Sequence, residues 1–257
     1  YTLRQPEGLT VTITPAQGAA TLTMESWTYG ENPAQPVAES ATNGTDAVTC
    51  HYTGTLADGV TPYDSADRPS DAGSYQVEAV FAATNNYQTV TKQAAFTIET
   101  RELTATWNSL DMVYNGAAQA PRIAGLIGVL EADAGKVQAS ADDSAQTAAG
   151  SYSALARLTG ERAHNYTLRN DTASFAIRPA PVVFQVEMSS APYDGQPHTA
   201  QITAQALGQV FEDFTIQYQS ADGQQTAQPV EAGRYPILAT ITDANYRHSD
   251  GADQAAR

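Results

Sequence analysis

Apolar and polar residues alternate along most of this chain. The stretches LTATW (103–107), VVFQV (182–186) and FTIQY (214–218) each place three apolar side chains on one face. A period of two is typical of a β-strand with one buried face and one face in water. Helical spacing does not persist for ten residues anywhere, although 126–135 and 208–214 could each form one helical turn. We therefore expect an all-β chain.

One strand motif occurs three times. It reads DAGSYQVEAVF at 71–81, AAGSYSALARL at 148–158 and EAGRYPILATI at 231–241. Each motif places a tyrosine, an apolar residue, an alanine and a second apolar residue on one face. An Asn-Tyr pair follows each motif, at 86–87, 165–166 and 245–246. The sequence therefore repeats with a period of about eighty residues.

The tyrosine of each motif follows a glycine bend. This order is similar to the tyrosine corner of Ig-like domains, in which the hydroxyl bonds to the backbone a few residues upstream. The glycine suits a bend with positive φ. The alanine indicates a place where the two sheets approach closely, since a larger residue would overpack it at a cost of about 1 to 3 kcal/mol. We predict structural roles for nine residues of the motif: Tyr75, Tyr152, Tyr235, Gly73, Gly150, Gly233, Ala79, Ala156 and Ala239.

The repeat predicts the domain boundaries. The opening residues match the end of the second repeat, with Val11 and Ile13 standing where Phe175 and Ile177 stand. The third repeat stops without a Phe-x-Ile strand. We expect four segments: the terminal strand of a preceding repeat at 1–16, whole repeats at 17–100 and 101–179, and a repeat lacking its last strand at 180–257.

Six or seven short strands per repeat, separated by Gly, Pro, Asn and Asp, predict tandem Ig-like antiparallel β-sandwiches. The connections between repeats are short, and Pro15, Pro179 and Pro181 limit their bending. We therefore expect an elongated rod. The two helical turns keep β-grasp-like repeats open as the alternative.

Several of these elements together resemble a known family. A Tyr-Gly or Tyr-x-Gly turn, a Gln-x-Pro-like step, Ala-Gly-x-Tyr, Asn-Tyr and Phe-x-Ile follow one another. This order resembles the tandem Ig-like repeats, including the MBG and YDG types, of large bacterial surface proteins. Residues 193–195 read Tyr-Asp-Gly, and NYQTVTKQAAFTIE at 86–99 is similar to the usual repeat ending. The resemblance implies a secreted or cell-wall-attached bacterial adhesin or stalk, without catalysis or a cofactor in the repeats.

Charge and composition restrict the classes of molecule that this chain could bind. The chain has 28 acidic and 13 basic residues and a formal net charge of −15, which disfavours nucleic acid and anionic membranes. Its longest apolar run, AGLIGVL at 124–130, is shorter than the ~20 residues of a membrane helix. Cys50 is the single cysteine, so an internal disulfide is excluded. We expect an extracellular or cell-surface protein that does not insert into membranes.

Motifs for chemistry are missing. The four histidines share no nucleophile elbow or zinc motif. Asp64, Asp67 and Asp71 could offer oxygen ligands to calcium, but they lack the spacing of a known loop and favour a hydrated turn. Cys50 stands at an inward position and favours packing over a thioester, and Lys92 has no counterpart in the other repeats that would indicate an isopeptide bond. We expect no enzymatic activity, no cofactor and no metal.

The favoured function is a structural stalk or adhesin region that projects or spaces a distal functional domain. The alternatives are a glycan- or mucin-binding module and an accessory segment of a surface hydrolase. Trp27 and Tyr63 are weak candidates for stacking on sugar rings. Partners would be host or cell-wall glycans or proteins, and open strand edges could pair molecules end to end through residues 1–14.

Overall fold

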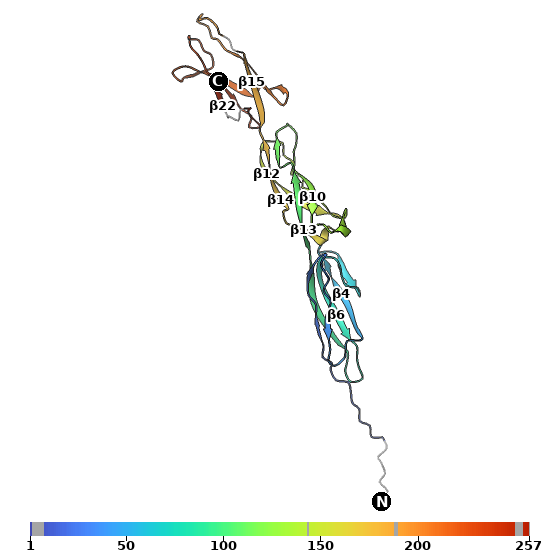
Figure 1. The fold of residues 1–257 in the computed structure, drawn as a ribbon. Helices are drawn as coiled ribbons and strands as arrows, with labels where there is room; N and C mark the ends of the chain where they lie inside the picture. Colours follow the sequence, from blue (N-terminus) through green and yellow to red (C-terminus); the bar gives the residue numbers. More distant parts are fainter. Residues whose placement is uncertain (2–7, 143, 188–189, 250–253, 257) are drawn as a thin grey trace. The chain divides into compact units, whose positions relative to one another are not determined.

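The computed structural model of the chain describes residues 1–257 apart from 2–7, 143, 188–189, 250–253 and 257. β-Strands make up nearly all of its regular structure (Figure 1). The helical elements among the described residues are two 3-10 turns, η1 (Glu131–Asp133) and η2 (Ala163–Asn165). The prediction of an all-β fold is confirmed. Of the two helical turns expected from the sequence, the first contains η1 and the second contains a strand, β17 (Gln209–Val210).

The chain divides into two compact units. Unit 1 comprises 1–104, 126–139 and 158–169, and unit 2 comprises 105–125, 140–157 and 170–257. Each unit therefore contains part of the second repeat. We keep first, second and third repeat as names for 17–100, 101–179 and 180–257.

The first repeat forms a five-stranded sheet in the order β2-β7-β6-β4-β5 and a two-stranded sheet of β1 and β3. The long strands β4, β6 and β7 pair antiparallel in the register set by the alternating pattern, with Tyr75 opposite Phe96. The strands are β1 (Thr21–Thr23), β2 (Trp27–Thr28), β3 (Val37–Glu39), β4 (Val48–Leu56), β5 (Pro62–Ser65), β6 (Gly73–Phe81) and β7 (Val90–Glu99).

The second repeat forms a sheet in the order β11-β12-β14-β9 and a sheet in the order β10-β8-β13. Tyr152 of β12 lies opposite Phe175 of β14, in the same register as the corresponding pair of the first repeat. The strands are β8 (Arg101–Asn108), β9 (Asp111–Val113), β10 (Arg122–Ile127), β11 (Gln138–Ala141), β12 (Gly150–Thr159), β13 (Tyr166–Leu168) and β14 (Thr172–Arg178).

The third repeat forms two four-stranded sheets, in the orders β17-β16-β15-β21 and β19-β18-β20-β22. The strand β22 pairs antiparallel with β20, so the third repeat has a short last strand where the sequence predicted none. Besides β17, the strands are β15 (Ala180–Glu187), β16 (Gln201–Ala206), β18 (Phe214–Gln219), β19 (Gln225–Thr226), β20 (Ile237–Ile241), β21 (Tyr246–His248) and β22 (Gln254–Ala256).

Most strand pairs are antiparallel, as the sequence predicted, but four of the sheets' edge pairs are parallel. Parallel pairs join β2 to β7, β9 to β14, β8 to β13 and β15 to β21. All four pairs involve a strand of two or three residues. Such short edge strands have no clear alternation of their own, so the pattern of the sequence could not show their direction.

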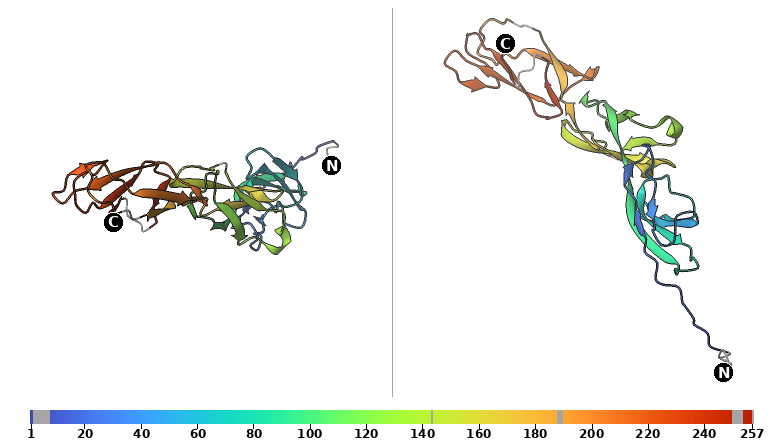
Figure 2. Two further views of the ribbon diagram at one scale, coloured as in Figure 1. Left: turned by 90° about the horizontal axis from the view of Figure 1, so that it is seen from above. Right: turned by 60° about the horizontal axis from the view of Figure 1, so that its bottom comes forward.

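The opening segment, expected to be the terminal strand of a preceding repeat, lies outside the sheets of the three repeats. Residues 9–15 of unit 1 run as an extended segment beyond the sheets, outside any strand (Figure 2). The side chains of Val11 and Ile13 are 91% and 90% exposed. The first contact that resembles sheet pairing is an isolated parallel bridge between Ala16 and Tyr87.

Four apolar clusters form the cores. Unit 1 contains one cluster around Val77 and Ile98 and a second around Leu103. Unit 2 contains one cluster around Ile177 and another around Val182. The side chains of these five residues are at most 1% exposed, as expected for the inward positions of alternating strands.

Candidate functional site: the tyrosine corners and the joints between repeats

Each motif tyrosine binds the backbone four residues upstream. The hydroxyl of Tyr75 donates to the carbonyl oxygen of Asp71 at 2.8 Å. The hydroxyls of Tyr152 and Tyr235 make the same contact at 3.0 Å, to the carbonyl oxygens of Ala148 and Glu231. This is the hydrogen bond expected of a tyrosine corner, and it fixes the loop before each strand.

The motif glycines are needed for a reason other than the predicted one. Gly73, Gly150 and Gly233 are absent from the positive-φ glycines of the described chain, so the prediction of a positive-φ bend is wrong. A Cβ atom on Gly73 would lie 2.5 Å from the carbonyl oxygen of Thr55 and 2.7 Å from the hydroxyl of Tyr75. On Gly150 it would lie 2.8 Å from the hydroxyl oxygen of the tyrosine two residues later. In the first two repeats the glycine therefore makes room for the folded-back tyrosine, whereas a Cβ on Gly233 would lie no closer than 3.4 Å to the ring of Tyr235.

The motif alanines are buried in all three repeats. Ala79, Ala156 and Ala239 each lie on the inward face of the strand that follows the corner. A larger side chain at these positions would have to displace packed neighbours.

The first corner is covered by the Asn-Tyr turn of the second repeat, within unit 1. The backbone N–H of Ala72 donates to Asn165 Oδ1 at 2.6 Å, and both residues are fully buried. Asn165 Nδ2 in turn donates to Asp71 Oδ1 at 3.0 Å, and Arg162 forms an ion pair with the same carboxylate. We call this set of contacts the first joint.

Two tyrosine rings complete the first joint. Tyr29 and Tyr166 pack edge to face with their ring centroids 5.5 Å apart. Their hydroxyls both donate to Asp133 Oδ2, at 2.8 and 2.6 Å, and the Asp133 residue is only 3% exposed. Burial and this hydrogen bond raise the pKa of Tyr166 to about 12 and that of Tyr29 still further above its ordinary value. Both hydroxyls therefore remain protonated donors to the buried carboxylate.

The same two contacts recur in unit 2, between the second repeat and the third. The backbone N–H of Ala149 donates to Asn245 Oδ1 at 2.7 Å. The rings of Tyr114 and Tyr246 pack edge to face at 5.2 Å. Asp243 accepts from the backbone N–H and from Nδ2 of Asn245, at 2.8 and 2.9 Å, and so orients the amide. We call this set the second joint.

The joints were not predicted from the sequence, although their residues were visible in it. The Asn-Tyr pair was recognised only as a marker of the repeat. Two features of the sequence could have indicated the joints. An asparagine recurs in the turn after each strand motif, and an alanine precedes the glycine of each motif. Asp133 gave no such signal, because its 3-10 turn is specific to the second repeat.

The candidates for glycan binding do not form a site. Trp27 is buried and stacks on Phe96 at 5.4 Å, so the prediction that it is open to sugar rings is wrong. Tyr63 is half-buried, packs edge to face on Tyr75, and donates its hydroxyl to the carbonyl oxygen of Asp67 at 2.9 Å. Both side chains therefore belong to the packing around the first corner.

The three aspartates considered as calcium ligands, Asp64, Asp67 and Asp71, do not form a metal-binding group in the described part of the chain. Asp64 contacts His51 at 2.6 Å, whereas Asp71 belongs to the first joint. Within the described part of the chain, no three His, Cys, Asp or Glu side chains are grouped so that they could hold a metal. Cys50 packs half-buried against the first core, where burial raises the pKa of its thiol.

The comparisons with known proteins agree with the repeat pattern at one place. Residues 184–253 match the family model of the MBG domain, a repeat domain associated with surface proteins. No curated protein matches the chain. Across the described residues, none of the helices has the length and apolar character needed to cross a membrane.

Proposed function

We propose that this chain is a tandem-repeat spacer region of a bacterial surface protein, which projects or separates a functional domain carried elsewhere. The observation that supports this proposal is the recurrence of one joint. Ala72 with Asn165, and Ala149 with Asn245, make the same hydrogen bond between successive repeats. Residues repeated at joints and corners serve the spacing of modules, whereas a binding site would need a repeated group of exposed side chains.

Each joint contains a hydrogen bond between an alanine N–H and an asparagine, and an edge-to-face pair of tyrosines. Two such contacts resist bending between repeats better than one. A hydrogen bond to a buried amide contributes about 0.5 to 1.5 kcal/mol, and an edge-to-face aromatic pair contributes a similar amount. The repeats are joined by short connections, so these contacts form between tethered partners at high effective concentration. A joint worth about 1 to 3 kcal/mol would hold the docked arrangement most of the time.

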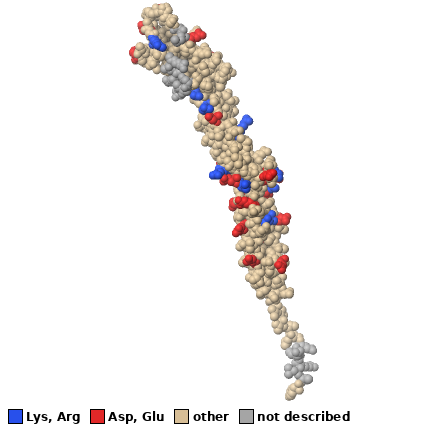
Figure 3. Space-filling view, in the orientation of Figure 1, with Lys and Arg blue, Asp and Glu red and all other residues tan. Residues whose placement is uncertain are grey.

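The surface supports a role outside the cell. Most of the face drawn in Figure 3 consists of uncharged residues, with acidic and basic side chains in scattered groups. The chain has few lysines and a net charge of −15, which favours solubility and disfavours nucleic acid. A spacer of this kind requires neither catalysis nor a cofactor, and attachment to the cell surface would come from other parts of the protein.

Small-angle X-ray scattering on the full chain tests the proposal. We expect the distance distribution of an extended particle, which broadens when Asn165 and Asn245 are both replaced by alanine. A compact particle, or a distribution that the double substitution leaves unchanged, would contradict the spacer role. Glycan binding is the weaker alternative because Trp27 is buried, and a glycan array with specific signals lost in Tyr63→Ala would revive it.

A further inference from the structure

The chain contains two Asn-Gly steps, Asn43-Gly44 and Asn115-Gly116. An asparagine before glycine can lose its side-chain amide without an enzyme, because the backbone nitrogen of the glycine attacks the side-chain carbon Cγ. Glycine permits this attack since it has no Cβ in the way and few restrictions on its backbone. The surroundings of the two steps decide whether either of them reacts in the folded protein.

The side chain of Asn43 is held in place. Its Nδ2 donates to the carbonyl oxygens of Ala82 and Gln88, both at 2.9 Å. Its Oδ1 accepts from the hydroxyl of Thr42 at 2.8 Å, and its backbone N–H donates to Ser40 Oγ at 2.9 Å. Attack on Cγ requires the side chain to turn toward the next backbone nitrogen, which would break these hydrogen bonds. The fold therefore protects Asn43.

Asn115 lies in an exposed loop after β9. Gly116 and Ala117 are also exposed, and a Cβ placed on Gly116 would meet no atom within 4 Å. Within the described chain, the side chain of Asn115 has one hydrogen bond, which Oδ1 accepts from the N–H of Ala117 at 2.9 Å. This N–H would stabilise the negative charge that develops on Oδ1 during the attack. The surroundings of Asn115 therefore favour the reaction.

The Asp-Gly steps of the described chain could form the same ring, but their carboxylates resist it. These steps are Asp58-Gly59, Asp194-Gly195 and Asp222-Gly223. Hydrogen bonds from Thr61 lower the pKa of Asp58 to about 2. A backbone N–H lowers the pKa of Asp194 in the same way, and a serine hydroxyl lowers the pKa of Asp222. An ionised carboxylate is a poor target for a nucleophile, so Asn115 is the most reactive of these positions.

The reaction at Asn115 first closes a ring and then opens it. The backbone nitrogen of Gly116 gives its proton to hydroxide and bonds to Cγ of Asn115. The bond from Cγ to Nδ2 breaks, and ammonia leaves with a proton from water, so that a succinimide ring remains. Water then adds to either carbonyl carbon of the ring. One opening leaves aspartate, and the other leaves isoaspartate, in which the main chain runs through the former side chain.

Aspartate at position 115 would preserve the turn. The third repeat reads YDG at 193–195, where the second repeat reads YNG at 114–116. Oδ1 of Asp194 accepts from the backbone N–H two residues later at 2.9 Å, which is the contact that Asn115 makes. The added charge would be exposed, where water and salt screen it. We therefore expect aspartate to change the turn little.

Isoaspartate would not fit, because both ends of the turn are anchored. The N–H of Tyr114 donates to the carbonyl oxygen of Arg178 at 2.8 Å and continues the pairing of β9 with β14. Gln119 and Gln146 exchange two backbone hydrogen bonds of 2.9 Å. Isoaspartate adds a carbon to the main chain between these anchors and removes the side-chain oxygen that closes the turn. The segment from 114 to 119 must then take a different path.

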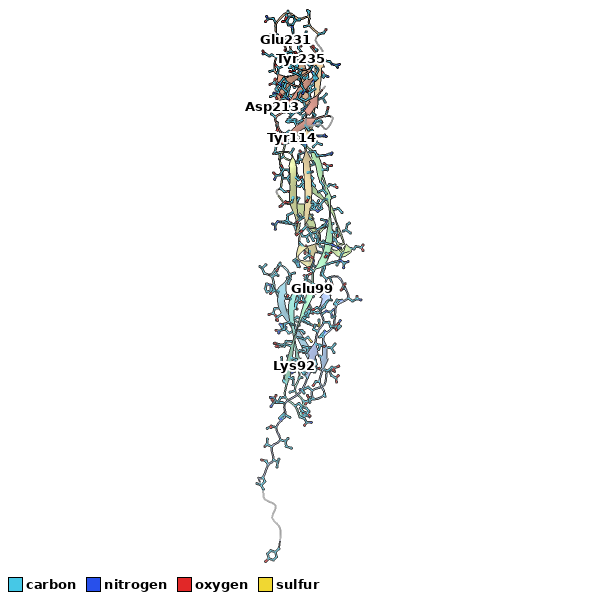
Figure 4. All side chains as sticks on the ribbon, turned by 90° about the vertical axis from the view of Figure 1, so that its left-hand side faces the viewer. Lys92, Glu99, Tyr114, Asp213, Glu231 and Tyr235 are labelled. Atoms are coloured by element: carbon cyan, nitrogen blue, oxygen red, sulfur yellow. The ribbon has the colours of Figure 1, made fainter. Side chains whose placement is uncertain are left out.

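Tyr114 directly precedes this step and belongs to the second joint. Its ring packs edge to face on Tyr246 at 5.2 Å. Burial, Tyr114 and the carboxylates of Asp243 and Asp213 raise the pKa of Tyr246. Figure 4 shows Tyr114 and Asp213 at this place in unit 2. Displacement of Tyr114 would remove the aromatic contact and leave the joint with the hydrogen bond of Asn245.

We propose that Asn115 deamidates spontaneously and that the isoaspartate formed there loosens the second joint. The inference rests on the proposed spacer function, in which the joints keep successive repeats docked. The corresponding turn of the first joint reads Tyr29-Gly30 and contains no asparagine. The second joint therefore weakens with the age of the molecule, whereas the first joint does not.

Ageing of the full chain at mildly alkaline pH, followed by peptide mass spectrometry, tests the modification. In the folded protein, Asn115 should lose its amide about tenfold or more faster than Asn43, because hydrogen bonds hold Asn43. In urea, where the fold protects neither residue, the two rates should be similar. Both rates should rise with pH, because the attacking nitrogen must lose its proton. Equal rates in the folded protein would overturn the assignment of Asn115.

Hydrogen exchange at the Ala149 amide, which donates to Asn245, tests the effect on the second joint. Exchange should be about two- to tenfold faster in aged protein that carries isoaspartate, the factor that corresponds to one aromatic pair. Fresh Asn115→Asp should exchange like the wild type, because it adds the charge without lengthening the main chain. Asn115→Ser cannot deamidate, and its hydroxyl can accept the same hydrogen bond, so ageing should leave its exchange unchanged.

Aged wild-type protein that carries isoaspartate at 115 and still exchanges at the fresh rate would overturn the link to the joint. The same acceleration in aged Asn115→Ser would also overturn it, because the cause would then lie elsewhere. These measurements concern one side chain and one amide, so their failure would leave the scattering test of the spacer function unaffected. A compact particle in that test would remove the spacer role and leave the chemistry of Asn115 to its own results.

Discussion

The hydroxyls of Tyr29 and Tyr166 converge on one oxygen of Asp133, although the two tyrosines are far apart in the sequence. Tyr29 belongs to the Tyr-Gly turn of the first repeat, and Tyr166 belongs to the Asn-Tyr turn of the second. A buried carboxylate is costly unless donors satisfy it. The two hydroxyls donate hydrogen bonds to the carboxylate only while the joint is formed. The buried carboxylate therefore couples the conformation of the Tyr29 turn to that of the Tyr166 turn.

Asp133→Ala should destabilise unit 1 by about 2 to 4 kcal/mol. The substitution leaves two largely buried hydroxyls without their acceptor, and each unsatisfied group costs about 1 to 3 kcal/mol, partly offset by removing a buried charge. Urea unfolding followed by tyrosine fluorescence measures the change. Asp46→Ala, at an exposed position, serves as the control and should lie within about 0.5 kcal/mol of the wild type. Equal effects of the two substitutions would contradict a role for the carboxylate in the joint.

Stability should fall at alkaline pH. The pKa of Tyr166 is raised to about 12 by burial and by its bond to Asp133, and that of Tyr29 is raised further. Tyrosines of the unfolded chain titrate near pH 10, so the unfolded state loses its protons first. The contribution of these groups is fully present below about pH 10 and is lost as pH rises through about 12.

Urea midpoints measured from about pH 8 to pH 11 test this dependence. In Tyr29→Phe and Tyr166→Phe, where one titrating group is removed, the decline should be shallower than in the wild type. A decline of the same slope in all three proteins would show that other groups cause it.

Asn165→Ala should cost more than Asn245→Ala. Both substitutions remove the acceptor of an alanine N–H, but Asn165 and Ala72 are fully buried, whereas Asn245 and Ala149 are only half-buried. We expect a loss of about 1 to 3 kcal/mol for the first joint and less for the second, where water can replace the amide. Hydrogen exchange at the two alanine amides reports the loss directly. Exchange rates that stay unchanged in both variants would exclude these asparagines as partners.

Gly73→Ala should destabilise by about 1 to 3 kcal/mol or more through overpacking. The added methyl group would meet a backbone oxygen of Thr55, which cannot swing away. Gly233→Ala offers a matched comparison at the same motif position, because its nearest neighbour is a ring atom of Tyr235 at 3.4 Å. Thermal unfolding should separate a large effect at Gly73 from a small one at Gly233. A reversed order would contradict the close approach at the first corner.

The sequence was informative where one residue acts through its own strand. The alternation predicted the long strands, and the motif predicted the hydroxyl contacts of Tyr75, Tyr152 and Tyr235. It was misleading for Trp27, because a single aromatic residue beside a turn carries no sign of whether another strand covers it. The short parallel strands and the hydrogen bonds from Tyr29 and Tyr166 to Asp133 join segments that are distant in the sequence. The periodicity of a single strand contains no information on such contacts.

The reason for the motif glycines shows the same limit. Glycine at a bend usually indicates positive φ, but here it indicates a neighbour that folds back onto the backbone. A positive φ angle and a side chain that folds back onto the backbone both require glycine, so the sequence alone does not distinguish them. Only the position of the tyrosine ring distinguishes them.

The hydrogen bond at each joint has a backbone N–H on one side and an asparagine side chain on the other. The main-chain half is the same whatever side chain the residue carries. A gene encoding such units can therefore gain, lose or exchange them by recombination without a new interface having to evolve, provided that each unit keeps its Asn-Tyr pair and the tyrosine of its first turn. In the proposed spacer function, length then becomes a property that selection can adjust in whole modules.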